Sequence, residues 1–349
     1  MALFNASEID LIKQGLFKTP VKVTIEDRDY GFFRNKLFGL PSQGTRDDYL
    51  MLDYKSVGVV LPDEALKGGD PNRVNYGTGF NEKAIFGKYF NDEDQISADQ
   101  CDNRIFGEDI QNPLSHEERM VALLAEKRDR IIQAHDLAFE KACVDAVLNG
   151  AFTTRQGGTQ SFPVTSALLS VSGANMSTSP ITVLGAGIKA IIKKKGGKPT
   201  MLILNPDDAA TLAESSAWQA VFDNRRMFGS EYDPKAETDG LSPIGTINLP
   251  GVGSIKVYAY YGAYDNGGTW TYMIPQGKAI LCPDKLGYKG YCGVYMDNGI
   301  YTGKEGVDHG VYVWFKEGAL PHTAHVQVQS APCPMLTAID KYCVFTSLS

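Results

Sequence analysis

The clearest pattern of apolar and polar positions along the chain follows Pro113. Ser115 and Glu118 have the S-x-x-E spacing of a capping box, in which the two side chains satisfy backbone groups at the start of a helix. No proline or glycine interrupts the chain from there to Gly150, a residue type that favours a helix end. This pattern predicts a helix of about 32 residues, which would be about 48 Å long.

The predicted helix cannot be buried along its whole length, because residues 126–130 are all charged. Its apolar positions form a stripe along one side that widens toward the C-terminal half. They are Val121, Leu124, Ile131, Ala138, Ala142 and most of residues 144–148. A helix of this length in a mixed protein is typical of a structural spine.

Two runs rich in strand-forming residues precede the helix. The first covers residues 49–60 and stops at Pro62, and the second covers residues 76–90. Turn-forming residues at positions 67–72 separate them. Together the runs predict a long hairpin over residues 47–92. A lone two-stranded hairpin is marginally stable in water, so one with this much apolar surface is expected to lie on a neighbouring element or a neighbouring subunit.

The first 46 residues carry short apolar clusters without a sustained period. Leu11 and Phe17 belong to the earlier clusters, and Phe32, Phe33 and Phe38 belong to the later ones. This pattern indicates an arm that packs against something other than itself.

The chain after residue 150 predicts a second set of elements. A hairpin is expected around residues 155–159, and a Ser/Gly-rich linker follows at residues 170–179. The expected helices beyond it cover residues 180–195 and 206–223, and the expected strands cover residues 200–204, 254–261, 269–274, 279–282, 291–296, 324–328 and 336–345. Helices interleaved with largely antiparallel strands indicate an α+β fold.

Length and composition support this division. At 349 residues the chain exceeds the usual size of a single core, so two packed subdomains with extended pieces are expected. Apolar residues make up 43% and charged residues 21%, and no apolar run approaches the length of a membrane span. The N-terminus lacks the basic start and apolar block of a signal peptide, so synthesis and folding in the cytoplasm are expected.

Cysteine spacing and net charge restrict the function further. The six cysteines form no closely spaced pair, and dispersed thiols in a reducing compartment are usually buried apolar residues. With 34 basic and 41 acidic residues, the net charge of −7 repels nucleic acid over the surface as a whole. A dedicated DNA-binding protein is therefore disfavoured, and any contact with DNA is expected to be weak and non-specific.

One motif points to an enzyme. Gly185, Gly187 and Ala190 satisfy the G-x-G-x-x-A fingerprint of dinucleotide sites, and Asp207 follows a later strand at a suitable distance. The same stretch also fits a helix that starts at Pro180, because apolar residues recur at steps of three and four along one face. The fingerprint needs a longer preceding strand, so the helix is the favoured interpretation. A nucleotide-dependent cytosolic enzyme is the alternative.

Histidines and cysteines late in the chain are weaker candidates for chemistry. His322 and His325 are three residues apart, but the pattern around them favours a strand, in which such residues point to opposite faces. His309, Cys333 and Cys343 lie nearby in the sequence without the spacing of metal ligands. Motifs of serine hydrolases, zinc proteases and phosphate-binding loops do not occur in the sequence. No catalytic residue, cofactor or metal ion is therefore expected.

Four stretches, in order and at similar spacing, resemble the lambda-type major head proteins, the E family within the Hong Kong 97 capsid fold. Residues 139–150 resemble the end of that family's spine helix, and residues 104–109 resemble its Gly-Glu approach to the helix. Residues 201–226 are similar to its strand, helix and paired-arginine region. Residues 328–336 are similar to its terminal Gln-Ser-Ala-Pro strand, although Cys333 and Pro334 interrupt the usual apolar run.

The resemblance implies a function. It identifies the chain as a major capsid protein that self-assembles into pentamers and hexamers and forms the icosahedral head around a double-stranded DNA genome. It also implies a place in the virion, assembly in the host cytoplasm, no enzyme activity, and a portal, a separate scaffolding protein and a decoration protein as partners. Another virion component, such as a decoration or tail protein, is a second alternative, but those proteins are usually smaller and need no spine helix.

The resemblance further implies a layout of parts. These are an N-terminal arm (1–46), an extended hairpin loop (47–92), a peripheral domain (93–172) with the spine helix (115–149), an axial domain (173–320) and return strands to the peripheral domain (321–349). The arm has no counterpart in the resemblance and holds no large helical scaffolding segment, which implies little or no N-terminal processing.

Two sets of residues are expected at subunit contacts in this layout. The hairpin is expected to lie over an adjacent subunit and to bury Phe80, Ile85, Phe86 and Tyr89 there. Arg225 and Arg226 are expected to make charge-assisted bonds across the axial interface, because paired guanidinium groups favour carboxylates. A solvated helix end is the alternative for the arginine pair.

Overall fold

The computed structural model describes residues 30–57, 78–106, 108, 113–155, 157–171, 176–194, 196–221, 240–249, 253–297, 302–305, 311–317, 323–346 and 348. The helices of this part are η1 (Phe33–Leu37), α2 (Ala98–Asp102), α3 (His116–Asn149), α4 (Ser166–Leu169), α5 (Pro180–Lys193), α6 (Pro206–Glu214) and α7 (Ser216–Val221). They are combined with mostly antiparallel strands, so the predicted α+β class is confirmed.

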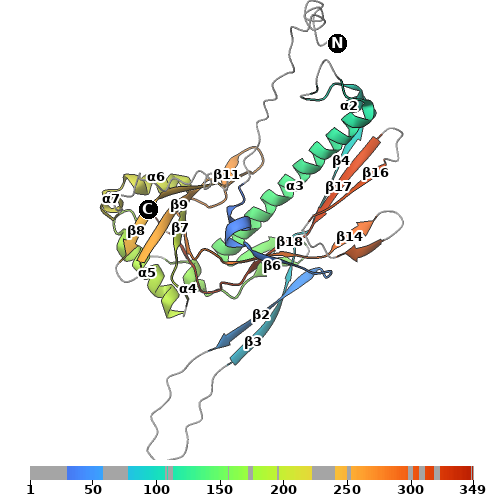
Figure 1. Cartoon of the computed structure of the whole chain (residues 1–349). Coiled ribbons are helices and arrows are strands. Elements are labelled where there is room, and N and C mark those ends of the chain that lie inside the picture. Colours follow the sequence, from blue (N-terminus) through green and yellow to red (C-terminus); the bar gives the residue numbers. More distant parts are fainter. Residues whose placement is uncertain are drawn as a thin grey trace, which may run out of the picture.

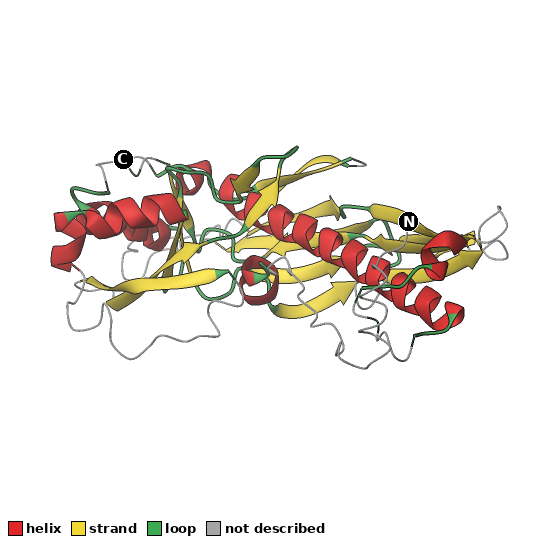
Figure 2. Ribbon diagram, turned by 90° about the horizontal axis from the view of Figure 1, so that it is seen from above, coloured by secondary structure: helices red, strands yellow, loops and turns green. Residues whose placement is uncertain are grey.

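The predicted spine helix is present as α3. The Ser115 hydroxyl accepts a hydrogen bond from the Glu118 backbone N–H at 3.3 Å, and the Glu118 carboxylate accepts one from the Ser115 backbone N–H at 2.8 Å. At the other end, Gly150 adopts the left-handed conformation with a φ of 62°, which glycine tolerates without steric cost. Figure 1 shows this helix crossing the molecule, and Figure 2 shows it running along the elongated body.

A three-stranded antiparallel sheet lies along α3 (Figure 1). Its order is β16 (Tyr312–Glu317), β17 (Thr323–Ser330) and β4 (Phe90–Ser97). Val326 and Val328 pair with Asp94 and Asp92, whose side chains reach α3, and both valines are buried. Phe90 therefore opens a strand of this sheet, and its assignment to the end of the hairpin is wrong.

A five-stranded sheet occupies the other end of the molecule. Its order is β19 (Cys343–Phe345), β12 (Ala279–Cys282), β7 (Met201–Leu204), β9 (Gly253–Tyr260) and β8 (Leu241–Leu249), with β7 and β9 parallel and the other neighbours antiparallel. Successive side chains of a strand point to opposite faces. Leu202 and Leu204 pack in the core beneath α5, α6 and α7, whereas Ile203 packs in the core around α3. The sheet therefore joins two cores.

The helix predicted over residues 206–223 is divided in the structure into α6 and α7. Ser215 between them has an extended backbone, with a φ of −69° and a ψ of 128°. The Ser215 hydroxyl donates to the carbonyl oxygen of Ser177, and Trp218 Nε1 donates to the carbonyl oxygen of Met176 at 2.7 Å. A tertiary contact, which periodicity does not reveal, therefore stabilises the break.

The remaining strands complete the described part. One three-stranded sheet has the order β1 (Leu40–Gly44), β13 (Gly287–Tyr291) and β18 (Pro332–Leu336). Four further sheets have two strands each: β2 (Tyr49–Val57) with β3 (Thr78–Phe86), β5 (Ala151–Thr154) with β6 (Gly158–Ser161), β10 (Ala263–Asp265) with β11 (Trp270–Tyr272), and β14 (Val294–Asp297) with β15 (Thr302–Glu305). The predicted hairpins are confirmed as the pairs β2–β3 and β5–β6.

The N-terminal segment packs inside the subunit where the structure describes it. Phe33, Leu37 and Phe38 are fully buried in the chain's own core. The backbone N–H groups of Phe33 and Arg34 donate to a carboxylate of α3 that lies 107 and 106 residues away in the sequence. This stretch therefore packs against something other than itself, as predicted, and its partners come from a distant part of the same chain.

All six cysteines are free and buried, as their dispersed spacing predicts. Burial raises the pKa of the Cys143 and Cys282 thiols well above the usual value. Protonated and enclosed, these side chains act as small apolar residues.

Candidate assembly surfaces

The β2–β3 hairpin has one face that the chain itself covers. Leu50, Leu52 and Ile85 are buried and belong to the core around α3. Leu50 pairs directly with Ile85 across the two strands, so both side chains point to the same face. Ile85 is 0% exposed within one chain. The expectation that an adjacent subunit buries Ile85 is therefore wrong, because the residue already lies in the core of its own subunit.

The opposite face of the hairpin carries apolar side chains that the chain leaves open. Tyr49 is 38% exposed and Met51 is 48% exposed, and both alternate with the buried Leu50 and Leu52. Tyr49 pairs with Phe86, and their ring centroids lie 5.7 Å apart. We call Tyr49, Met51 and Phe86 the outer hairpin patch. Two strands thus place three apolar side chains together on one side.

The other predicted contact residues are placed less completely. Tyr89 follows β3 and is 39% exposed. The backbone of Phe80 pairs with Lys55 within the hairpin, but its side chain lies outside the described part. Arg225 and Arg226 also lie outside the described residues. The roles of these residues at a subunit contact stay predictions.

The base of the hairpin is fastened by the β5–β6 pair. Lys83 Nζ donates to the Ser161 hydroxyl at 2.7 Å, and the Phe86 backbone N–H donates to Gln160 Oε1 at 3.3 Å. A Cβ on Gly157 would lie 2.8 Å from Phe86 Cβ, so only a glycine permits this approach. The hairpin therefore leaves the body in a defined direction, toward the lower left of Figure 1.

Glu140 is a buried acid that joins three parts of the chain. Its Oε1 accepts hydrogen bonds from the Phe33 N–H at 2.8 Å and the Tyr260 hydroxyl at 2.7 Å, and its Oε2 accepts one from the Arg34 N–H at 2.7 Å. Burial raises the pKa of this carboxyl to about 7, and the hydrogen bonds oppose the rise. Glu140 ties η1 and β9 to the spine helix. The sequence shows only an acid within a largely apolar stretch, which does not reveal these partners.

A second buried acid, Glu108, supports the start of the spine helix. Arg119 Nη2 donates to Glu108 Oε1 at 2.6 Å, and the backbone N–H groups of Ile105 and Leu114 donate to the carboxylate at 2.9 and 2.8 Å. The bond from Arg119 lowers the pKa of the Glu108 carboxyl. Both buried acids therefore hold connections between elements.

Ser330, His135 and Asp92 form a chain of hydrogen bonds like that of a hydrolase triad. Ser330 Oγ lies 2.9 Å from His135 Nδ1, and His135 Nε2 lies 2.7 Å from Asp92 Oδ2. The serine is 2% exposed, whereas the aspartate side chain is 60% exposed. A nucleophile must reach its substrate, so this order is the reverse of a working triad. The bonds instead fasten β17 and β4 to the spine helix.

The G-x-G-x-x-A stretch lies inside α5. No described strand leads into it, because the helix already begins at Pro180. A Cβ on Gly187 would lie 2.6 Å from Phe345 Cζ, so this glycine lets α5 pack closely against β19. The helix prediction is confirmed. The dinucleotide interpretation is wrong, since that fingerprint needs its glycines at the turn between a strand and a helix.

The late histidines and cysteines are scattered where they are described. His325 on β17 bonds to the Glu93 carboxylate, Cys333 and Cys343 are buried, and His309 and His322 lie outside the described residues. No group of three or more potential metal ligands occurs among the described residues. In the same part of the chain, no helix has the length and apolarity of a membrane span.

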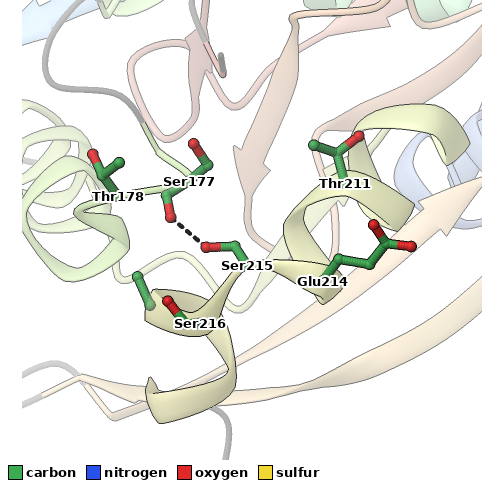
Figure 3. A pocket seen from close by; sticks show the side chains of 7 residues that line it. Ser177, Thr178, Thr211, Glu214, Ser215 and Ser216 are labelled. Atoms are coloured by element: carbon green, nitrogen blue, oxygen red, sulfur yellow. Dashed lines mark hydrogen bonds between the residues drawn. The ribbon is translucent and has the colours of Figure 1, made fainter.

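An open hollow lies where α6 meets α7 (Figure 3). It is lined by Ser177, Thr178, Thr211, Glu214, Ser215, Ser216 and Ala217. The Ser215 hydroxyl is already bonded to the Ser177 carbonyl oxygen. Glu214 is the single ionisable side chain of this lining, so the hollow offers no acid and base pair for catalysis.

A protein-family comparison decides between a shell subunit and the alternatives. The model of the family described as phage major capsid protein E matches residues 22–347. The chain belongs to this family. This capsid protein is therefore a structural component of a virion that assembles with copies of itself, and neither the nucleotide-dependent enzyme nor a decoration or tail protein fits the match. No curated protein matches the chain.

Solved structures confirm the Hong Kong 97-like fold of this capsid protein. A crystal structure assigned to a prophage capsid protein of Escherichia coli CFT073 has a TM-score of 0.59 at 18% identity, covering 77% of this chain and 79% of that one. The capsid of a native GTA particle has a TM-score of 0.55 at 10% identity, covering 100% of both chains. The mature capsid of bacteriophage PhiM1 has a TM-score of 0.53 at 9% identity, covering 95% of this chain and 90% of that one.

Proposed function

We propose that this capsid protein assembles into pentamers and hexamers that close into the icosahedral head around a double-stranded DNA genome. In this proposal the hairpin of each subunit lies over its neighbour. The observation that carries it is the two-sided hairpin: one face is fixed in the chain's own core, and Tyr49 and Met51 of the outer hairpin patch are left exposed.

Contacts of this kind suit a shell. When one surface meets a different surface on the next copy, the contact repeats, and it closes into a ring when the rotation between copies is a whole fraction of a turn. A hairpin held firmly at its base by β5–β6 can present the same patch to a neighbour in every ring. Tyrosine, phenylalanine and methionine are enriched in the centres of protein interfaces, which fits the composition of the patch.

The proposal assigns a role to each part of the chain. Residues 1–46 serve as the arm, apart from the stretch at 32–38 that packs in the core. Residues 47–92 serve as the hairpin loop, apart from Phe90 and the residues after it, which belong to β4. The peripheral domain (93–172) is built around α3, and the axial domain (173–320) surrounds the centre of each ring, except that β16 of this range joins the sheet along α3. Residues 321–349 return to the periphery through β17 and β18, whereas β19 joins the five-stranded sheet. Supporting this assignment, the two cores centre on α3 and on the sheet beneath α5.

Further partners belong to the same proposal. Assembly takes place in the host cytoplasm with a separate scaffolding protein and a portal, and a decoration protein can bind the finished shell. The net charge of −7 favours weak, non-specific contact with the packaged DNA over tight binding. Arg225 and Arg226 form charge-assisted contacts across the axial interface, and reversing both charges should prevent ring formation in electron micrographs.

The test of the proposed function is assembly of purified subunits with and without scaffold, observed by negative-stain microscopy. The wild-type chain should form rings and closed particles. The double variant Tyr49→Ser/Met51→Glu should lower the melting temperature of the subunit by no more than about 5 °C, because both positions are partly exposed and only the Tyr49–Phe86 ring contact is lost, and it should form no closed particles. Deletion of residues 65–76, which lie outside the described part, should also leave subunits without shells.

Asn81→Glu provides the matched control. Asn81 is exposed on the same hairpin and pairs with Tyr54, so it lies on the face opposite the outer hairpin patch. This variant should assemble normally. Normal shells from Tyr49→Ser/Met51→Glu would refute the role of the patch, and a wild-type chain that never forms rings would refute the proposed function as a whole.

A further inference from the structure

The outer face of α5 carries apolar side chains that the subunit does not bury. Ile181 is 48% exposed and Ile192 is 51% exposed. They are eleven residues apart, about three helical turns, so they lie on the same side of the helix. Gly185 stands between them, one turn after Ile181.

Nothing in the described part of the chain explains Gly185. Glycine in a helix interior is less favourable than alanine. The close approach of Phe345 accounts for Gly187, but no atom lies within 4 Å of the position that a Cβ on Gly185 would take. A glycine at this place therefore indicates that a surface outside the subunit comes close to the helix.

Exposed side chains of opposite charge lie on α5 and α6. Lys189 and Lys193 are exposed on α5, and Asp207 and Glu214 are exposed on α6, and none of the four side chains has a hydrogen bond or ion pair within the described part of the chain. Glu214 occupies the last turn of α6, where the helix dipole disfavours an acid. Glu214, like Gly185, is a residue that its own helix does not favour.

The two helices lie apart on the same end of the molecule. In Figure 1, α6 runs along the upper edge of this end and α5 along the lower edge. In a ring of copies, opposite edges of one subunit meet different neighbours. Figure 3 shows Thr211 and Glu214 near each other on α6, where both line the open hollow. Ala210 and Thr211 are small and exposed, so this helix can accept a close partner.

We infer that the outer face of α5 in one copy packs against the outer face of α6 in the next copy around a ring. Gly185 permits close approach of the helices beside Ala210 and Thr211, Ile181 and Ile192 are buried at the contact, and Lys189 and Lys193 face the acids of α6. This inference rests on the proposed ring assembly and names the residues of one contact in it.

The decisive variants are Gly185→Ala and Glu214→Lys, because each is expected to help the isolated subunit and to harm the ring. Gly185→Ala should raise the melting temperature of the subunit by about 1–3 °C, since alanine favours the helix. Glu214→Lys should leave it equal or slightly higher, since a lysine suits the helix C-terminus. Both should raise the subunit concentration needed for ring formation by about fivefold or more, measured by sedimentation and microscopy.

A charge exchange tests the pairing of the two helices. Lys189→Glu should impair ring formation as Glu214→Lys does, and the two combined should restore it at least in part, because the opposite charges face each other again. Lys285→Glu is the matched control: Lys285 is exposed, belongs to neither α5 nor α6, and should assemble as the wild type does.

The outcomes separate the two ideas. If the wild type forms rings and Gly185→Ala and Glu214→Lys form them at the same concentration, the α5–α6 contact is overturned while the proposed function stands. If the single charge variants fail and their combination does not recover, the pairing of α5 with α6 is overturned. If the wild type forms no rings with scaffold present, the proposed function fails and the contact fails with it.

Discussion

The C-terminal half of α3 and the β2–β3 hairpin are both regular elements rich in apolar residues, yet the subunit treats them differently. Phe139, Cys143 and Val147 of α3 are enclosed by the chain's own strands. In the hairpin, Ile85 is enclosed in the same way, while Met51 on the other face stays open. Apolar content therefore does not distinguish a core element from a contact surface. What distinguishes them is whether side chains of the same chain cover the apolar face.

Among the enclosed residues of α3, Glu140 is the one whose removal should lower the stability of the subunit most. Glu140→Ala leaves the N–H groups of Phe33 and Arg34 and the Tyr260 hydroxyl buried without an acceptor. The free energy of unfolding should fall by about 3–6 kcal/mol, because each buried unsatisfied donor is costly. Urea denaturation followed by circular dichroism measures it. Glu126→Ala, at an exposed position of the same helix, should change stability by less than about 0.5 kcal/mol.

The same carboxyl should make the enclosed core sensitive to pH. Burial raises the pKa of Glu140 from 4.5 to about 7, so the folded protein holds a proton that the unfolded chain has already lost. The resulting stabilisation is complete below pH 4.5 and disappears as the pH rises through 7, a loss of about 3 kcal/mol.

Thermal and urea unfolding between pH 4.5 and pH 8 checks this prediction. Glu140→Gln carries no proton to lose, so the difference between wild type and variant should shrink as the pH rises. A constant difference across this range would show that the folded carboxyl does not titrate there.

Substitutions on the two faces of the hairpin test the comparison directly. Ile85→Ala should lower the free energy of unfolding by about 2–4 kcal/mol, because it opens a cavity in the core. Met51→Ala should change it by less than about 0.5 kcal/mol and yet weaken particle formation. Unfolding and assembly assays on the same two proteins separate the roles. Equal destabilisation by both variants would contradict the two-faced hairpin.

The smallest effect is expected at the start of the spine helix. Ser115→Ala removes the side-chain acceptor of the Glu118 N–H and should lower stability by about 1 kcal/mol. Ser115→Asp keeps an acceptor and should stay within a few tenths of a kcal/mol of the wild type. Chemical denaturation of the three proteins measures the series, and a full loss in Ser115→Asp would mean that the cap does not act through this bond.

Local signals in the sequence predict a good part of the fold. Ser115, Glu118 and Gly150 set both ends of the spine helix, since a cap depends on residues within one turn. The runs on either side of residues 58–77 predict the β2–β3 pair, although the second strand stops at Phe86 and Phe90 joins another sheet. The break at Ser215 escapes prediction because Met176 and Ser177, which hold it, lie in a distant segment.

For the candidate contact residues, too, the sequence predicts local features but not contacts with distant segments. Alternation along the hairpin predicts that it has two faces, but it cannot say which face the rest of the chain covers, so Ile85 is misassigned. Glu140 is visible only as an acid in an apolar stretch, and its partners come from η1 and β9.

By itself, the sequence determined the spine helix, α5, the β2–β3 and β5–β6 hairpins, the likeness to capsid proteins and the burial of the cysteines, because these depend on neighbours in the chain or on residue type. Only the tertiary structure decided that Phe33, Ile85 and Glu140 belong to the core, and that Met51 and Gly185 face outward. Burial is a property of the contacts between segments far apart in the chain, and no local pattern contains the position of the second segment.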